Sequence, residues 1–301
     1  MSRAVFSMNS VTGWLQTAFV KMALGVFFVF PSRVRVALFG WFVAYVMAPV
    51  LGWRKRMQDN LGLALPELSR RDRARLITRT SKNLGRLFME LLSPAYLKRQ
   101  ADRAEFEGPG LEQLYAAREA GQAVVMVSGH FGNYDVFRAG LIGKGFDVGA
   151  LYRPMNNRAF NDIYESAIRT TGEPLFSRGR SGMGAMIRHL RAGKVVALLI
   201  DQHMDRGAAL QFFGQTARTS LSAADMALKY RALLVPIYAI RVPDEIGFRV
   251  RVEKPIPNST PEAMTQALND SLEAQVRAYP DQWLWTHRRW KTRAAGGGGQ
   301  P

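Results

Sequence analysis

Two long apolar runs dominate the first 53 residues of the chain. Residues 11–30 carry one charge, Lys21, and residues 36–53 carry none. At about 1.5 Å per residue the second run reaches roughly 27 Å, close to the thickness of a hydrocarbon core. The pattern predicts a membrane anchor or a re-entrant hairpin, which Arg54-Lys55-Arg56 would end. Two helices buried in a protein core are the alternative.

The next segment, residues 54–100, has the periodicity of an amphipathic helix. Its apolar positions recur every three or four residues: Leu76, Ile77, Leu84, Leu87, Phe88 and Leu91. Ser69 and Asp72 have the spacing of a capping box, with Asp in place of Glu. The apolar stripe is expected to face the core, while the opposite, arginine-rich face suits phospholipid headgroups.

From residue 110 onward, helical patterns alternate with short apolar runs. Strands are predicted at 123–128, 148–152, 195–201, 234–241 and 248–253. Helices are predicted at 132–142, 157–170, 182–191, 221–230 and 261–278. Such alternation is typical of the α/β class, so we expect a mostly parallel or mixed central sheet flanked by helices, with one antiparallel edge.

Three regions follow from these patterns. Residues 1–56 form the predicted hydrophobic membrane anchor or hairpin, and residues 57–293 form an α/β domain. Residues 294–301 are rich in glycine and are predicted to be a disordered tail.

Composition narrows the chemistry. The absence of cysteine excludes disulfides, thiolate metal sites and cysteine nucleophiles. No two histidines have a metal-ligand spacing, so no metal is expected. A net charge of +17 suits nucleic acid, an anionic membrane or acidic partners. The predicted strands are aliphatic, whereas base-stacking aromatics would be expected in a nucleic-acid-binding sheet, so nucleic acid is not an expected partner.

The segment from Ser128 to Asp135 carries the candidate chemistry, because it joins a buried strand to a helix. Ligands of open α/β sheets bind beyond the carboxyl ends of the strands, where His130 is expected. Gly132 permits a tight bend and Asn133 can cap the following helix. We expect Asp135 to fold back onto His130 and make the imidazole a general base. A histidine that only braces the turn is the alternative.

Several blocks of the sequence resemble one family. His130 to Asp135 is similar to the His-x4-Asp/Glu signature of glycerolipid and lipid A acyltransferases. Further blocks resemble the lipid A biosynthesis late acyltransferases, which are the lauroyl and myristoyl transferases of the lysophospholipid acyltransferase-like superfamily. They are Asn60-Leu61 with Pro66, Tyr152–Asn157, Asp201–His203, Phe212–Gly214 with Thr219, and 280–293. The blocks follow the family's order across roughly residues 10–293.

The resemblance implies a glycerolipid acyltransferase-like fold with N-terminal membrane-associated helices. It implies secondary acylation of a lipid A precursor, in which a hydroxyl of this glycolipid receives a fatty acyl chain from acyl carrier protein. The expected place is the cytoplasmic face of a bacterial inner membrane, in contact with membrane lipids. Acyl-ACP or acyl-CoA would serve as co-substrate, without a further cofactor.

The resemblance also implies roles for individual residues. His130 would be the catalytic base and Asp135 its partner. From the residues themselves, we expect Gly132 and Asn133 to form the turn, and we expect backbone N–H groups at the helix start after Gly132, or Arg153, to stabilise an oxyanion. Substrate-binding roles fall to Arg153, Asn156, Asp201, Gln202 and Arg218.

Two questions stay open at the level of the sequence. The first motif has Asp135 where many lipid A enzymes have Glu, which leaves the acceptor undecided. A lysophospholipid or another glycolipid is the alternative acceptor, with acyl-CoA as a possible donor. Arginines are candidates for binding lipid phosphates or an acidic carrier protein, or they form a solvated basic surface: Arg153, Arg178, Arg180, Arg218, Arg288, Arg289 and Arg293.

Overall fold

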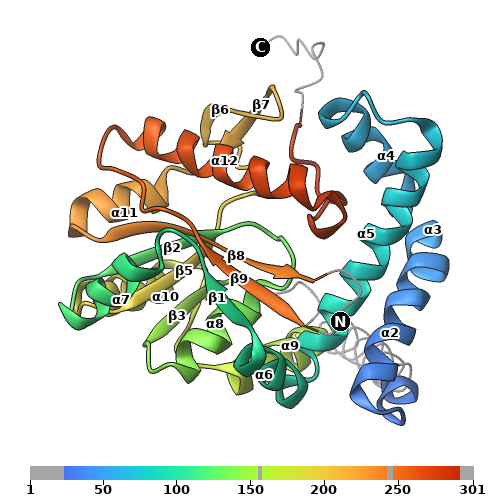
Figure 1. Ribbon diagram of the computed structural model, residues 1–301, viewed down its shortest axis with the longest axis horizontal. Helices are drawn as coiled ribbons and strands as arrows, with labels where there is room; N and C mark the ends of the chain where they lie inside the picture. The colour runs from blue at the N-terminus through green and yellow to red at the C-terminus, as the bar shows by residue number, and fades with distance from the viewer. Residues whose placement is uncertain (1–23, 155–157, 243–246, 292–301) are drawn as a thin grey trace, which may run out of the picture.

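A seven-stranded mixed sheet forms the centre of the molecule (Figure 1). The structure is a computed structural model that describes residues 24–154, 158–242 and 247–291, without the side chains of 158–160. The strand order is β1-β9-β8-β2-β5-β3-β4. The strands are β1 (Glu105–Glu107), β2 (Val124–Ser128), β3 (Val148–Tyr152), β4 (Leu175–Ser177), β5 (Val195–Leu199), β8 (Leu233–Arg241) and β9 (Phe248–Val252).

The direction of the strands confirms the expected mixed sheet. Strands β8, β2, β5, β3 and β4 are parallel to one another. Strand β9 is antiparallel to β8, and β1 is parallel to β9, so the antiparallel edge consists of two strands. The carboxyl ends of β2, β5 and β3 consequently lie side by side at one edge of the sheet.

Helices cover both faces of this sheet, which explains its aliphatic strands. Alternate residues of β2 contact different layers: Val124 and Met126 face one core, whereas Val125 and Val127 face the other. The first core includes α6 (Pro94–Arg103), α7 (Leu111–Glu119), α8 (Tyr134–Gly143) and α9 (Arg158–Thr171). The second includes α10 (Arg180–Arg191), α11 (Ser222–Tyr230) and α12 (Pro261–Ala278).

A group of N-terminal helices packs beside the sheet. Helix α2 (Ser32–Phe42) continues through a π-helical turn (Val43–Met47) into α3 (Ala48–Val50), and α4 (Trp53–Ala64) follows. The long helix α5 (Arg70–Leu91) lies between α2 and the rest of the domain (Figure 1). Gly40 and Gly85 let the backbones of α2 and α5 approach closely, because a Cβ at Gly85 would lie 2.8 Å from the Gly40 Cα.

The predicted amphipathic segment 54–100 is in fact three helices, α4, α5 and α6. Pro66 lies in the break after α4, and Pro94 begins α6, where its fixed φ and missing N–H suit the first turn. The predicted cap at Ser69 is confirmed, since its Oγ accepts a hydrogen bond of 3.1 Å from the Asp72 N–H.

Some short elements were not expected from the sequence. They are α7, β1, β4, the 3₁₀ turn Pro280–Gln282 and the hairpin of β6 (Ala208–Phe212) and β7 (Gln215–Thr219). Each is too short or too polar to show a clear apolar period. Residues 243–246, between β8 and β9, lie outside the described residues, as do residues 1–23 and the tail.

Candidate active site

The turn between β2 and α8 holds His130 at the carboxyl edge of the sheet. Gly132 has φ +56°, and a Cβ there would lie 1.8 Å from the Ala239 carbonyl oxygen, so no other residue fits without moving the backbone. Asn133 caps α8 as expected, with its side chain accepting a hydrogen bond of 3.2 Å from the Asp135 N–H. The turn therefore places His130 directly after the buried strand β2.

Asp201 is the carboxylate that holds His130. Its Oδ1 lies 2.7 Å from His130 Nδ1, and its Oδ2 accepts a bond of 2.8 Å from the His130 backbone N–H. Trp283 Nε1 donates a further bond of 2.9 Å to Oδ2. Asp201 follows β5, the hydrogen-bonded neighbour of β2, so the topology of the sheet brings the two residues together.

These contacts keep Asp201 ionised. Burial by itself would raise the pKa of Asp201, but the adjacent His130 imidazole and the hydrogen bonds from His130 and Trp283 lower that pKa to about 2. An ionised carboxylate only accepts hydrogen bonds, so His130 Nδ1 carries a proton and donates a hydrogen bond to Asp201. The other ring nitrogen, Nε2, is then the basic one.

The predicted pairing of His130 with Asp135 is wrong. Asp135 is buried in the first turn of α8 and accepts a hydrogen bond of 2.9 Å from Arg138 Nε. The two nitrogens at the tip of Arg138 donate to the carbonyls of Ile168 and Gly172, both at 2.8 Å. On a helix, residues three apart lie on one face, so Arg138 holds Asp135 along α8, while the imidazole contacts Asp201.

Backbone N–H groups at Gly132 and Asn133 do not form an oxyanion site. The Gly132 N–H donates to the Gln282 carbonyl at 2.8 Å, and the Asn133 N–H donates to the Ala239 carbonyl at 3.2 Å. Both donors are consumed within the protein, so this part of the prediction is wrong. The role of these residues in shaping the turn is confirmed.

An open cleft lies beside His130. One wall is a face of α5, and the other is the C-terminal segment 281–286. The residues that line it include Leu84, Leu87, Trp283, Leu284 and Trp285, and the two tryptophans are buried. A basic imidazole in such a cleft can remove a proton from a hydroxyl that is bound there.

The structure places the predicted substrate-binding residues in different parts of the molecule. Gln202 lies at the site, with its side-chain nitrogen 3.4 Å from His130 Nε2. Arg153 is exposed just after β3, and Arg218 is exposed on β7, where it donates a bond of 3.1 Å to the Gly207 carbonyl. Neither arginine lines the cleft in the part of the chain that the structure describes. Asn156 lies outside the described residues.

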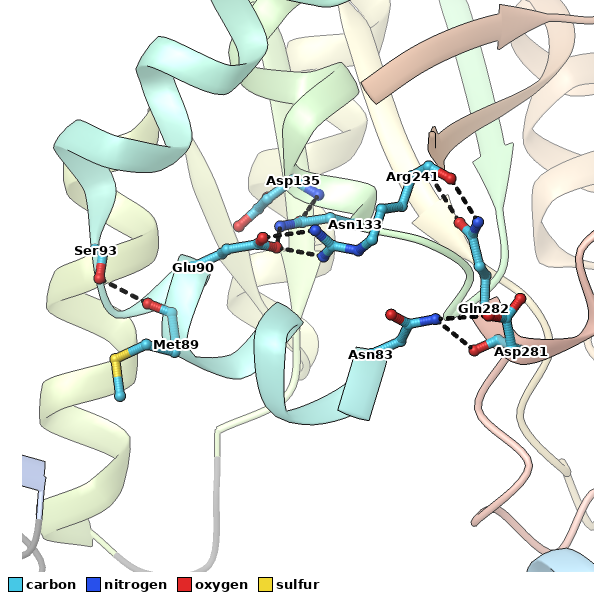
Figure 2. A network of polar contacts seen from close by, with 9 residues as sticks. All are labelled: Asn83, Met89, Glu90, Ser93, Asn133, Asp135, Arg241, Asp281 and Gln282. Atoms are coloured by element: carbon cyan, nitrogen blue, oxygen red, sulfur yellow. Dashed lines mark hydrogen bonds and ion pairs between the residues drawn. The ribbon is translucent and has the colours of Figure 1, made fainter. Parts of the chain in front are cut away.

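A buried ionic network behind the turn was missed by the sequence analysis (Figure 2). Glu90 on α5 is 1% exposed and binds both terminal nitrogens of Arg241, at 2.8 and 2.7 Å. The same carboxylate accepts a bond of 2.9 Å from the Asn133 side chain. Gln282 joins the backbone of Arg241 from the other side, with bonds of 2.8 and 2.7 Å. The sequence signal for this network is Glu90, a carboxylate at the end of the apolar stripe of α5.

The C-terminal block braces the loop that carries Asp201. Arg289 is fully buried and donates a bond of 2.7 Å to the Arg218 carbonyl and one of 3.3 Å to the Gln202 carbonyl. Burial lowers the pKa of Arg289 to about 10. This arginine is therefore a brace and cannot be one of the surface residues that bind phosphate, as the sequence had allowed.

His287 supports the same loop as an acceptor. Its Nε2 accepts a bond of 2.9 Å from the His203 backbone N–H. Burial lowers the pKa of His287 to about 4, so the ring stays neutral near pH 7. Asn60 on α4 donates to the carbonyls of Trp285 and His287, at 2.7 and 2.8 Å, which fixes this block against the N-terminal helices.

Comparison with known proteins identifies related sequences. The family description "Bacterial lipid A biosynthesis acyltransferase" matches residues 6–292. The lipid A biosynthesis palmitoleoyltransferase of Escherichia coli (strain K12) is 24% identical over 245 residues, which cover 79% of each chain. A lipid A biosynthesis acyltransferase of Haemophilus influenzae is 22% identical over 292 residues, covering 94% of this chain and 91% of its own.

A relative with another named acceptor also matches. The phosphatidylinositol mannoside acyltransferase of Mycobacterium tuberculosis (strain CDC 1551 / Oshkosh) is 28% identical over 199 residues, or 64% of this chain and 62% of its own. The family match covers more of the chain than the match to this relative. It includes the described N-terminal helices and residues 281–286, which line the cleft. This chain belongs to the bacterial lipid A biosynthesis acyltransferase family.

Proposed function

We propose that this acyltransferase performs secondary acylation of a lipid A precursor, moving a fatty acyl chain from acyl carrier protein to a hydroxyl of the glycolipid. His130 is the general base, and Asp201 orients it. The observation that carries the proposal is the bond of 2.7 Å between His130 Nδ1 and a buried, ionised Asp201, at a histidine that lines an open cleft.

The reaction needs a single base and no covalent enzyme intermediate. His130 Nε2 removes the proton of the acceptor hydroxyl, and the resulting alkoxide attacks the carbonyl carbon of the acyl thioester. An ester C–O bond forms as the C–S bond breaks, and the thiolate leaves. The imidazolium then returns its proton to the thiolate. The Asp201 carboxylate stabilises the imidazolium between these two transfers.

Substrate positioning falls to polar groups near the ring. The Gln202 side chain, 3.4 Å from His130 Nε2, is placed to hold the hydroxyl or the thioester at the reacting nitrogen. Arg153, which follows a strand at the same edge of the sheet, is proposed to bind a phosphate of the acceptor. Asn156 and Arg218 remain proposed substrate contacts.

The charge of the chain supports an acidic donor and a phosphorylated acceptor. A net charge of +17 attracts both acyl carrier protein and an anionic lipid surface. The apolar helix Ser32–Val50 supports attachment to a membrane. We therefore place the reaction at the cytoplasmic face of a bacterial inner membrane, with the acyl thioester as co-substrate and no further cofactor.

The decisive test of the mechanism is His130→Ala, assayed with radiolabelled acyl-ACP and a lipid A precursor. Loss of a general base is expected to lower turnover by about 10²–10⁴-fold or more. The circular dichroism spectrum should match that of the native enzyme, whereas the melting temperature should fall, because the buried Asp201 loses the imidazole that helps to lower its pKa. Full activity in a correctly folded variant would rule out the mechanism.

A second acceptor class, a lysophospholipid or another glycolipid with acyl-CoA as donor, is favoured by the similarity to the mannoside acyltransferase. Mass spectrometry of lipids from cells that lack this protein separates the two. Lipid A without one secondary acyl chain supports the proposal, and its mass also gives the length of the missing chain. Intact lipid A with a changed phospholipid or glycolipid pool supports the second class.

A further inference from the structure

Exposed large apolar side chains gather in one region of the described structure. They all lie between residues 26 and 63: Val26, Phe28, Val29, Phe30, Val34, Leu38, Trp41, Tyr45, Val46, Val50, Leu51 and Leu63. Soluble monomers rarely expose so many neighbouring apolar residues, so a surface of this kind normally has an occupant.

The helix Ser32–Val50 has two apolar faces, and only one of them is covered. Its buried positions are Val36, Phe39, Gly40, Val43, Ala44 and Ala48. The exposed stripe consists of Val34, Leu38, Trp41 and Tyr45. These four positions are three or four residues apart, so they form one continuous line along the helix.

The covering helix, α5, is too polar to enter a bilayer. It lies along the helix Ser32–Val50 (Figure 1). Lys82 and Arg86 of α5 lie beside Gly40, where the two backbones meet. Lys82 Nζ lies 5.5 Å from the centre of the Tyr45 ring. If Ser32–Val50 crossed a membrane, these cations would enter the hydrocarbon. Each would cost about 2.5–3.5 kcal/mol at its centre.

The exposed cations near this helix indicate what covers the apolar stripe. Arg33, Arg54 and Lys55 are exposed near the two ends of the helix, and Arg70 and Arg71 are exposed at the start of α5. A second copy of the chain would place its own cations against these, and the repulsion would disfavour such a contact. An anionic lipid surface attracts each one, by about 1 kcal/mol. Tryptophan and tyrosine in the stripe are the residues that favour the level of the headgroups.

We propose that the helix Ser32–Val50 lies in the plane of one leaflet of an anionic phospholipid bilayer and does not cross it. The stripe Val34, Leu38, Trp41 and Tyr45 enters the boundary between headgroups and acyl chains, and α5 stays on the aqueous side. Because α5 also forms a wall of the His130 cleft, the active site is then one helix away from the lipid surface.

A depth measurement tests the proposal directly. The chain has no cysteine, so the single variants Val34→Cys, Leu38→Cys, Trp41→Cys and Tyr45→Cys can each carry one environment-sensitive fluorophore. The full-length protein is added to vesicles of phosphatidylcholine and phosphatidylglycerol that contain lipids brominated near the headgroup or near the chain end. All four labels should lie at one shallow depth, about 5–10 Å into the boundary.

Other outcomes of this experiment overturn the proposal. A label that reaches the bilayer centre at Trp41, between shallower ends, shows a spanning helix. Labels that stay in water show that lipid is not the occupant. Labels that are shielded without vesicles, in a concentration-dependent manner, show that a second copy of the chain covers the stripe. Ala116→Cys, at an exposed position on α7, is the matched control and should remain unquenched.

Labelling from one side gives an independent check. Arg33→Cys and Lys55→Cys lie near opposite ends of the helix, and both are exposed. In sealed membranes, an impermeant maleimide should label both from the side on which Ala116→Cys reacts. Reaction of Arg33→Cys from the opposite side alone would mean that the helix crosses the bilayer. Neither result depends on catalytic activity, so it stands apart from the proposed acyl transfer.

Discussion

Two buried carboxylates near His130 have opposite surroundings. Asp201 contacts the imidazole at the open cleft, whereas Asp135 forms an ion pair of 2.9 Å with Arg138 inside the protein. Only Asp135 belongs to the short sequence motif, yet the residue that contacts the imidazole follows the neighbouring strand, β5. The comparison shows that residues close together in sequence form the turn. The contact between the imidazole and Asp201 forms instead between residues that follow two neighbouring parallel strands.

The largest effect is expected for Asp201→Asn. An asparagine can stabilise the wrong tautomer of His130 and cannot balance the imidazolium, so turnover should fall by about 10²–10⁴-fold. Steady-state kinetics on purified protein measure this fall, and the far-UV spectrum checks the fold. Turnover within twofold of the native enzyme would contradict an orienting role for Asp201.

The matched variant Asp135→Asn should lose stability rather than turnover. It leaves Arg138 buried without its carboxylate, and breaking a buried ion pair costs about 3–5 kcal/mol. Urea unfolding measures the loss, and turnover is compared per folded molecule. A loss of turnover equal to that of Asp201→Asn, with native stability, would show that Asp135 is the residue that assists His130. The apolar double variant Asp135→Leu/Arg138→Met should recover part of the stability.

Glu90→Gln tests the network behind the turn. Arg241 and Asn133 both depend on this carboxylate, so we expect a loss of about 1–3 kcal/mol in unfolding free energy. The exposed variant Glu112→Gln on α7 is the control and should change little. Native stability in Glu90→Gln would show that the amide replaces the carboxylate in the network.

The last prediction concerns the pH dependence of stability. The pKa of His287 is about 4 in the fold, against 6.5 ordinarily, so the unfolded chain takes up this proton first as pH falls. Stability should therefore decline between about pH 6.5 and 4, as a falling melting temperature. The pKa of Asp201 is about 2 against 3.8, so its stabilising contribution is complete above pH 3.8 and is lost below it.

His287→Gln separates the two groups, because its side-chain oxygen can still accept the His203 N–H. The variant should show a shallower decline between pH 6.5 and 4 and the same decline below pH 3.8. An unchanged slope between pH 6.5 and 4 would assign that decline to another group.

Local patterns in the sequence were sufficient for most of the central elements. The helix over residues 261–278 was predicted with the bounds that the structure shows, since Thr260 caps it and Pro261 begins it. Strands β2 and β5 were recognisable because a strand buried on both faces is apolar throughout. The turn at Gly132 and the cap at Asn133 followed from backbone chemistry that acts over a few residues.

The sequence by itself thus determined the α/β class, the position of His130 at the end of a buried strand and the family. The tertiary structure alone decided that Asp201, and not Asp135, holds the imidazole, that Glu90 braces the turn, and that Arg289 is buried. Hydrogen-bonding groups far apart in the chain meet only when the order of the strands is fixed. That order depends on packing of the whole core, which no local pattern records.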